Sequence, residues 1–135
     1  MKQPQQPIVR KLRSNSDITD IVGTGIFPLQ APPSYSLPYI LYAISDNLPQ
    51  DSKDGASTLD VYEMQITMLD TNYSNLVRLA NAVRSELDYT KEFTYNSITL
   101  QLVYFIDEIE AFDNDLDQGG TFIKTQTYGI RIKNI

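Results

Sequence analysis

The chain has 135 residues, of which 41% are hydrophobic and 21% are charged, a composition typical of one globular domain. It contains no cysteine and no histidine. Disulfides, thiolate metal sites, cysteine nucleophiles and Ser-His-Asp arrangements are therefore excluded. No run of sequence approaches the roughly 20 apolar residues of a membrane-spanning helix, so no membrane partner is expected.

Charge is distributed unevenly along the chain. All 17 acidic residues lie between Asp17 and Asp117, where only four basic residues accompany them, so this stretch has a net charge of −13. The two ends together carry +7 and no acid. One interpretation is a set of solvated loops on an acidic protein. The other is a pair of complementary surfaces on neighbouring subunits, and this hypothesis names as interface residues Arg10, Lys11, Arg13, Asp107, Glu108 and Glu110.

The first 23 residues predict two short helices. Residues 1–7 are rich in glutamine and proline, and we expect them to form a loose segment at the start of a single domain over 1–135. Apolar spacing predicts a helix over 7–15. The proline at residue 7 is compatible with this start, because proline is well tolerated at a first helical position. A second helical turn is predicted over 16–23, with acidic residues near its start and a glycine at its end.

The next part of the chain favours extended structure. Residues 24–28 form a short extended piece, and the prolines of 30–34 exclude a helix interior. Residues 39–44 are apolar on both faces, which is typical of a central strand. A long, exposed and mobile loop is predicted over 46–57.

A strand followed at once by a helix is the clearest local pattern. Apolar residues occupy every second position of 62–68, as in a strand with one buried face. The apolar spacing then becomes helical over 73–87. Between them, the side-chain oxygens of Asp70, Thr71 and Asn72 can cap the first turn of the helix.

The C-terminal third predicts a hairpin. Residues 89–96 are interpreted as a polar connection, residues 97–112 as a strand that becomes acidic, and residues 121–132 as the last strand. The segment 113–120 between the two strands is interpreted as an exposed turn. At the start of the first of these strands, one face is expected to carry Ile98, Leu100 and Leu102.

The order of these elements predicts an α+β fold. It consists of an antiparallel or mixed sheet of about four strands with two helices packed on one face.

The acidic run over 107–117 is the main candidate for chemistry. Asp113, Asp115 and Asp117 have the spacing that begins a calcium loop. A calcium loop also needs a glycine at its sixth position and a glutamate at its twelfth, where this chain has Gln118 and Lys124. A solvated hairpin tip is therefore favoured, and no catalytic, cofactor or metal residue is assigned.

Taken together, the segments resemble the tail terminator, or tail-completion, family of long-tailed bacteriophages. The matching pieces are a short N-terminal helix, the sequence Ile-Val-Gly-Thr-Gly-Ile-Phe-Pro at 21–28, and Leu-Pro-Tyr-Ile-Leu-Tyr at 37–42. The strand–helix unit ending at 76–87 and the closing hairpin also match. The longer loop at 46–57 and the acidic run depart from the family pattern.

The resemblance implies a structural virion protein of the tail or neck, assembled in the host cytoplasm. Its subunits would form a ring, usually a hexamer, that caps the head-proximal end of the tail tube, stops its growth and joins tail to head. Implied partners are other copies of the chain, the tail tube protein, a head-completion or connector protein, and phage DNA passing through the ring. No enzymatic activity and no cofactor are expected.

Two other functions are compatible with the sequence. The first is a small adaptor or binding domain of another assembly, because a fold alone does not fix a function. The second is a metal-dependent hydrolase that uses the acidic run.

Overall fold

The computed structural model describes residues 3–49, 59–114 and 119–133. Three helices are α1 (Gln5–Arg13), α2 (Ser16–Val22) and α3 (Tyr73–Leu87). The strands are β1 (Ile26–Pro28), β2 (Tyr39–Pro49), β3 (Leu59–Asp70), β4 (Thr90–Tyr95), β5 (Ile98–Asp113) and β6 (Thr121–Lys133).

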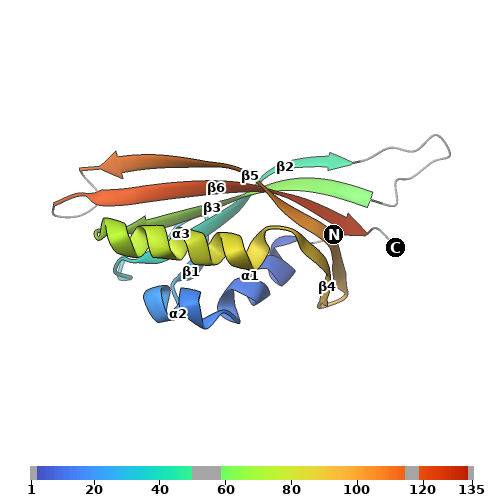
Figure 1. Ribbon diagram of the computed structural model, residues 1–135, viewed down its shortest axis with the longest axis horizontal. Coiled ribbons are helices and arrows are strands. Elements are labelled where there is room, and N and C mark those ends of the chain that lie inside the picture. The colour runs from blue at the N-terminus through green and yellow to red at the C-terminus, as the bar shows by residue number, and fades with distance from the viewer. Residues whose placement is uncertain (1–2, 50–58, 115–118, 134–135) are drawn as a thin grey trace.

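The strands form one strongly twisted sheet in the order β1-β2-β3-β6-β5-β4. The short β1 runs parallel to β2, and all other neighbours are antiparallel, so the sheet is mixed. All three helices lie on the same face of the sheet (Figure 1). The predicted α+β class is confirmed, whereas four strands and two helices were an undercount for the described part of the chain.

The core lies between the helices and the covered face of the sheet. Along β3, Met64, Ile66 and Met68 are fully buried and Gln65 is exposed, which confirms the predicted alternation. Helix α3 faces them with a buried stripe of apolar residues. The stripe consists of Leu76, Leu79, Ala80, Val83 and Leu87.

Side-chain caps mark the starts of α2 and α3. The Asn72 side chain accepts a hydrogen bond of 3.0 Å from the amide of Asn75, and Asp70 accepts one of 3.0 Å from the amide of Asn72. These contacts confirm the predicted cap of α3. Asn15 caps α2 in the same way, by accepting from the amide of Asp17 at 2.9 Å. Helix α1 begins at Gln5, two residues before the predicted start.

Two predicted loops proved to be partly strand. Residues 90–95 form β4, which pairs antiparallel with the start of β5. Its side chains are largely exposed, so the sequence lacks the alternation that marks a half-buried strand. Likewise β2 continues to Pro49 by pairing with β3, so residues 46–49 are not loop. The remainder of that predicted loop lies outside the described residues, as do residues 115–118 of the predicted turn.

Strand β5 contains two irregularities that change which residues face the helices. The first lies between Leu100 and Leu102, and the second lies between Phe105 and Asp107. Because a one-residue shift reverses the faces of a strand, Leu102 lies opposite Arg131 on the uncovered face, contrary to the expectation that it would follow Leu100. After the second irregularity, the even-numbered residues 108, 110 and 112 face the helices.

Candidate functional site

Helix α1 carries the basic residues that the sequence marked as interface candidates. Lys11 contacts residues of its own subunit. Its ammonium lies 3.0 Å from a carboxylate oxygen of Glu86 on α3 and 4.8 Å from the ring centre of Phe93 on β4. Its side chain therefore joins α1 to two other elements. This placement gives Lys11 a role in the fold itself.

Arg10 and Arg13 are placed differently. Both are exposed. The Arg13 guanidinium donates a hydrogen bond of 3.0 Å to the carbonyl of Ile26, and the Arg10 guanidinium lies 5.5 Å from the ring centre of Tyr95. Within residues 3–49, 59–114 and 119–133, neither arginine forms an ion pair with a carboxylate.

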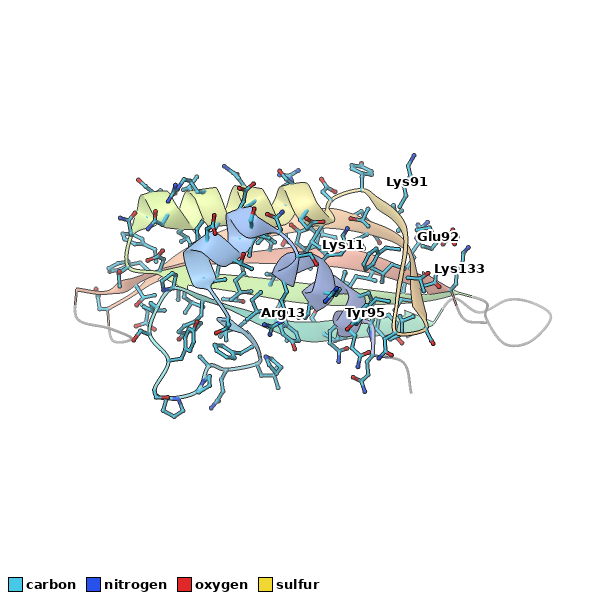
Figure 2. The ribbon with its side chains drawn as sticks, turned by 90° about the horizontal axis from the view of Figure 1, so that it is seen from below. Lys11, Arg13, Lys91, Glu92, Tyr95 and Lys133 are labelled. Atoms are coloured by element: carbon cyan, nitrogen blue, oxygen red, sulfur yellow. The ribbon has the colours of Figure 1, made fainter. Side chains whose placement is uncertain are left out.

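The two arginines border an open groove of about 410 Å³ between α1, β2 and the tip of the β4–β5 hairpin. Figure 2 shows Arg13 on α1 and Tyr95 on the tip of this hairpin. The groove is otherwise lined by amide and aromatic side chains, among them Gln3, Gln6, Tyr42 and Asn96. A groove with two cations and several amide donors favours an acidic or hydrogen-bond-accepting partner.

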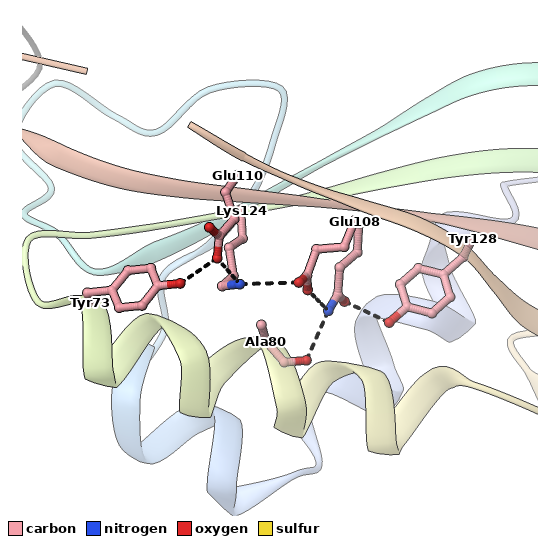
Figure 3. Close-up of polar contacts among 7 residues, drawn as sticks. Tyr73, Ala80, Glu108, Glu110, Lys124 and Tyr128 are labelled. Carbon is pink, nitrogen blue, oxygen red and sulfur yellow. Dashed lines mark hydrogen bonds and ion pairs between the residues drawn. The ribbon is translucent and has the colours of Figure 1, made fainter. Parts of the chain in front are cut away.

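The acidic candidates lie on β5, in the part of the strand that pairs with β6 and not with β4. Glu108 and Glu110 face α3, where Lys124 of β6 lies between them (Figure 3). The Lys124 ammonium is 2.5 Å from a Glu110 oxygen and 3.2 Å from a Glu108 oxygen. The phenol of Tyr73, at the start of α3, donates to the same Glu110 oxygen at 2.6 Å.

The contacts continue along β6 toward the middle of α3. The amide nitrogen of Gln126 donates to Glu108 at 2.9 Å and to the backbone carbonyl of Ala80 at 3.0 Å. Its amide oxygen accepts a hydrogen bond of 2.7 Å from the phenol of Tyr128. This polar cluster joins β5, β6 and α3 beneath the sheet (Figure 3).

The pKa shifts follow from these contacts. The hydrogen bond from Lys124, followed by that from Tyr73, lowers the pKa of the Glu110 carboxyl. For Lys124, burial alone would lower the pKa, but the hydrogen bonds to Glu110 and Glu108 outweigh it and raise the pKa. The hydrogen bond to Glu110 raises the pKa of Tyr73, and burial raises that of Tyr128. All four groups are thus held in their ordinary charge states at neutral pH.

Asp107 lies on the uncovered face of β5, opposite Thr127, and is exposed. The structure therefore separates the six candidate residues into two groups. Lys11, Glu108 and Glu110 form ion pairs within the subunit, whereas Arg10, Arg13 and Asp107 are exposed at its surface.

Sequence reasoning had not identified Lys124, Gln126 and Tyr73 as partners of the acidic strand. The spacing of Lys124 and Gln126 along the chain could have indicated their role. Both occupy positions of β6 at which the alternation of a strand places apolar residues toward the core. A polar residue at such a position needs a buried partner.

The suggested calcium spacing includes Asp115 and Asp117, which lie outside the described residues. Among the residues that are described, no group of three or more acidic side chains is arranged to hold a metal ion. No helix in the same part of the chain is long and apolar enough to cross a membrane.

Comparison with known proteins gives the class of this fold. A chain described as "Virion of native gene transfer agent (GTA) particle" has a similar structure, with a TM-score of 0.76 and 16% sequence identity over 96% of this chain and 93% of that chain. At this identity, the likeness shows the fold alone. No curated protein matches the sequence.

The model of the family described as "Tail completion protein gp17" matches residues 6–115, which is most of the chain. The chain therefore belongs to this family of tail completion proteins. It is a structural protein of the virion, in the tail or neck, as the sequence resemblance predicted.

Proposed function

We propose that this chain is the subunit of a ring, with six copies as the expected number, that closes the head-proximal end of the tail tube. The ring ends growth of the tube and joins the tail to the head. Its partners are other copies of the chain, the tail tube protein and a head-completion or connector protein, and phage DNA passes through its centre. The protein acts by binding, without catalysis and without a cofactor. Membership of the tail completion family supports this role.

The separation of charge on the subunit is the structural observation that supports ring formation. Arg10 and Arg13 border the groove beside α1, on the covered face of the sheet, while Asp107 is exposed on the uncovered face of β5. A cyclic ring larger than a dimer needs two different surfaces, one meeting the other on the next copy. Opposite charges on these two surfaces would set the orientation of neighbours and speed their encounter.

The basic surface can be tested by reversing its charge. The variant Arg10→Glu with Arg13→Glu should still fold but should cap far fewer tail tubes, measured by electron microscopy of tube ends after mixing with tubes of the same virus. A matched control reverses two exposed charges elsewhere, Arg78→Glu and Lys91→Glu, and should cap tubes as the unmodified protein does. Lys91 lies on β4, as Figure 2 shows.

Lys11 is left unchanged in this experiment, because its replacement would break the ion pair with Glu86 and confuse misfolding with loss of assembly. Circular dichroism establishes that each variant is folded. Equal capping by the two double variants would refute a role for the basic surface. Bare tubes with the unmodified protein, at high concentration and low salt, would refute the proposed capping function as a whole.

A further inference from the structure

The outer edge of β5 is only partly covered. Strand β4 pairs with β5 from Ile98 to Val103. From residue 106 to residue 112, β5 pairs with β6 on one side, and no described strand pairs with its other side. The amide of Phe105, just before this stretch, is already occupied, because it donates a hydrogen bond of 2.9 Å to the Asp88 side chain. The outward backbone groups of the seven residues 106–112 have no strand partner among the described residues, and such an edge is the usual template for addition of another strand.

This edge also carries exposed apolar side chains. Ile106, Ile109 and Phe112 are 41%, 63% and 48% exposed. Natural edge strands are commonly protected by charges that project into solvent. Here Glu108 and Glu110 are turned toward Lys124 beneath the sheet, and Asp107 is left exposed beside exposed isoleucines on a strand of high β-propensity.

The edge is held in place before any partner arrives. Glu110 is bound by Lys124 and Tyr73, and the ring of Phe112 lies 4.9 Å from that of Phe122, which in turn lies 5.3 Å from Tyr73. These contacts join the free half of β5 to β6 and to the start of α3. A strand that is already ordered loses less conformational entropy on binding.

A second uncovered edge lies on the other side of the sheet. Strand β1 pairs with β2 only at residues 40–42. Over 43–49, the side of β2 away from β3 has no partner among the described strands, and Ile44 is 38% exposed. Because β2, β3, β6 and β5 are successively antiparallel, β2 runs opposite to β5. The two uncovered edges lie toward opposite ends of the sheet (Figure 1).

We propose that the free edge of β5, residues 106–112, pairs antiparallel with the free edge of β2, residues 43–49, in a second copy of this chain. The contact rests on the proposed function and names the subunit interface of the ring. Each copy contributes a different edge to each neighbour, so the contact can repeat around a ring.

The charges of β5 select this partner over a second β5. Pairing of two β5 edges would bring together two strands that each carry Asp107, Glu108 and Glu110, and like charges on facing strands are destabilising. The segment 43–49 of β2 contains a single acidic residue. A β5–β2 contact is therefore favoured over a symmetric β5–β5 dimer.

Site-specific cross-linking tests the pairing directly, because the chain has no cysteine of its own. Ser45→Cys lies in the free edge of β2, and Ile109→Cys lies in the free edge of β5; both positions are exposed. The full chain with both substitutions is mixed with tail tubes of the same virus and treated with a short bismaleimide. The expected result is a ladder of covalent oligomers on a denaturing gel, up to the number of copies in the ring.

The control places the second cysteine at Tyr89, which is 74% exposed and lies outside both edges. This pair, and each single cysteine, should give no ladder. Capped tubes in micrographs without a ladder from the Ser45/Ile109 pair would overturn the β5–β2 contact and leave the capping function standing. Dimers from Ile109→Cys alone would show β5–β5 pairing and overturn it as well. Absence of capping in every sample, including the unmodified protein, would overturn both the contact and the proposed function.

Discussion

The substitution Ile66→Ala tests the packing of the sheet against the helices. Ile66 is fully buried in the middle of β3, opposite Tyr42 of β2 and Gln126 of β6. The change removes three buried carbon atoms, and the lost transfer free energy at ~0.8 kcal/mol for each is about 2.4 kcal/mol. A residual cavity adds to this value, so the expected loss of unfolding free energy is about 2–5 kcal/mol.

The measurement is equilibrium unfolding in urea, followed by circular dichroism, with an unchanged slope showing that the same transition is compared. Gln65→Ala is the matched control, because Gln65 is adjacent in sequence but exposed on the opposite face. It should cost less than ~0.5 kcal/mol in the isolated subunit. A loss below ~1 kcal/mol for Ile66→Ala, or a larger loss for Gln65→Ala, would refute the assignment of the covered face.

Three further predictions concern stability and are measured by the same unfolding assay. Gly129→Ala should destabilise the subunit by about 1–3 kcal/mol, because a Cβ would lie 2.2 Å from the ring of Tyr104, and adding Tyr104→Ala should recover part of the loss. Asn72→Ala should cost about 1 kcal/mol by removing the cap of α3, whereas retention of full stability would show that the cap contributes nothing. The lowered pKa of Glu110 means that its contribution is complete at neutral pH and is lost as the pH falls below 4.5, so Glu110→Gln should lower stability at neutral pH and weaken the acid dependence. An unchanged acid dependence in that variant would contradict the ion pair with Lys124.

The strand–helix unit of β3 and α3 was determined by local sequence. Its alternation, its helical stripe and its cap all depend on residues within a few positions of one another, and period and capping rules read such information directly. The α+β class and the family resemblance followed from the order of several such units. Glycine at 23 likewise ends α2 with a positive φ of 60°, as its place in the sequence predicted.

The tertiary structure decided the strands and charges whose partners are distant in sequence. Strand β4 exists because β5 pairs with it, although its own side chains are mostly exposed. The first irregularity in β5 reversed the face that a strict period of two had assigned to Leu102, and the second restored the original phase, so that Glu108 faces the helices as Leu100 does.

The ion-pair partners of individual charged residues are likewise distant from them in the sequence. Lys11 meets Glu86 across 75 residues, and Lys124 meets Glu108 across 16, so neither pair is visible as local spacing on one helix or strand. Composition and local periodicity therefore determined most of the elements and the overall excess of charge. Only strand pairing and packing decided which of those charges are neutralised inside the subunit and which edges and arginines are left at its surface, because both depend on where distant segments meet.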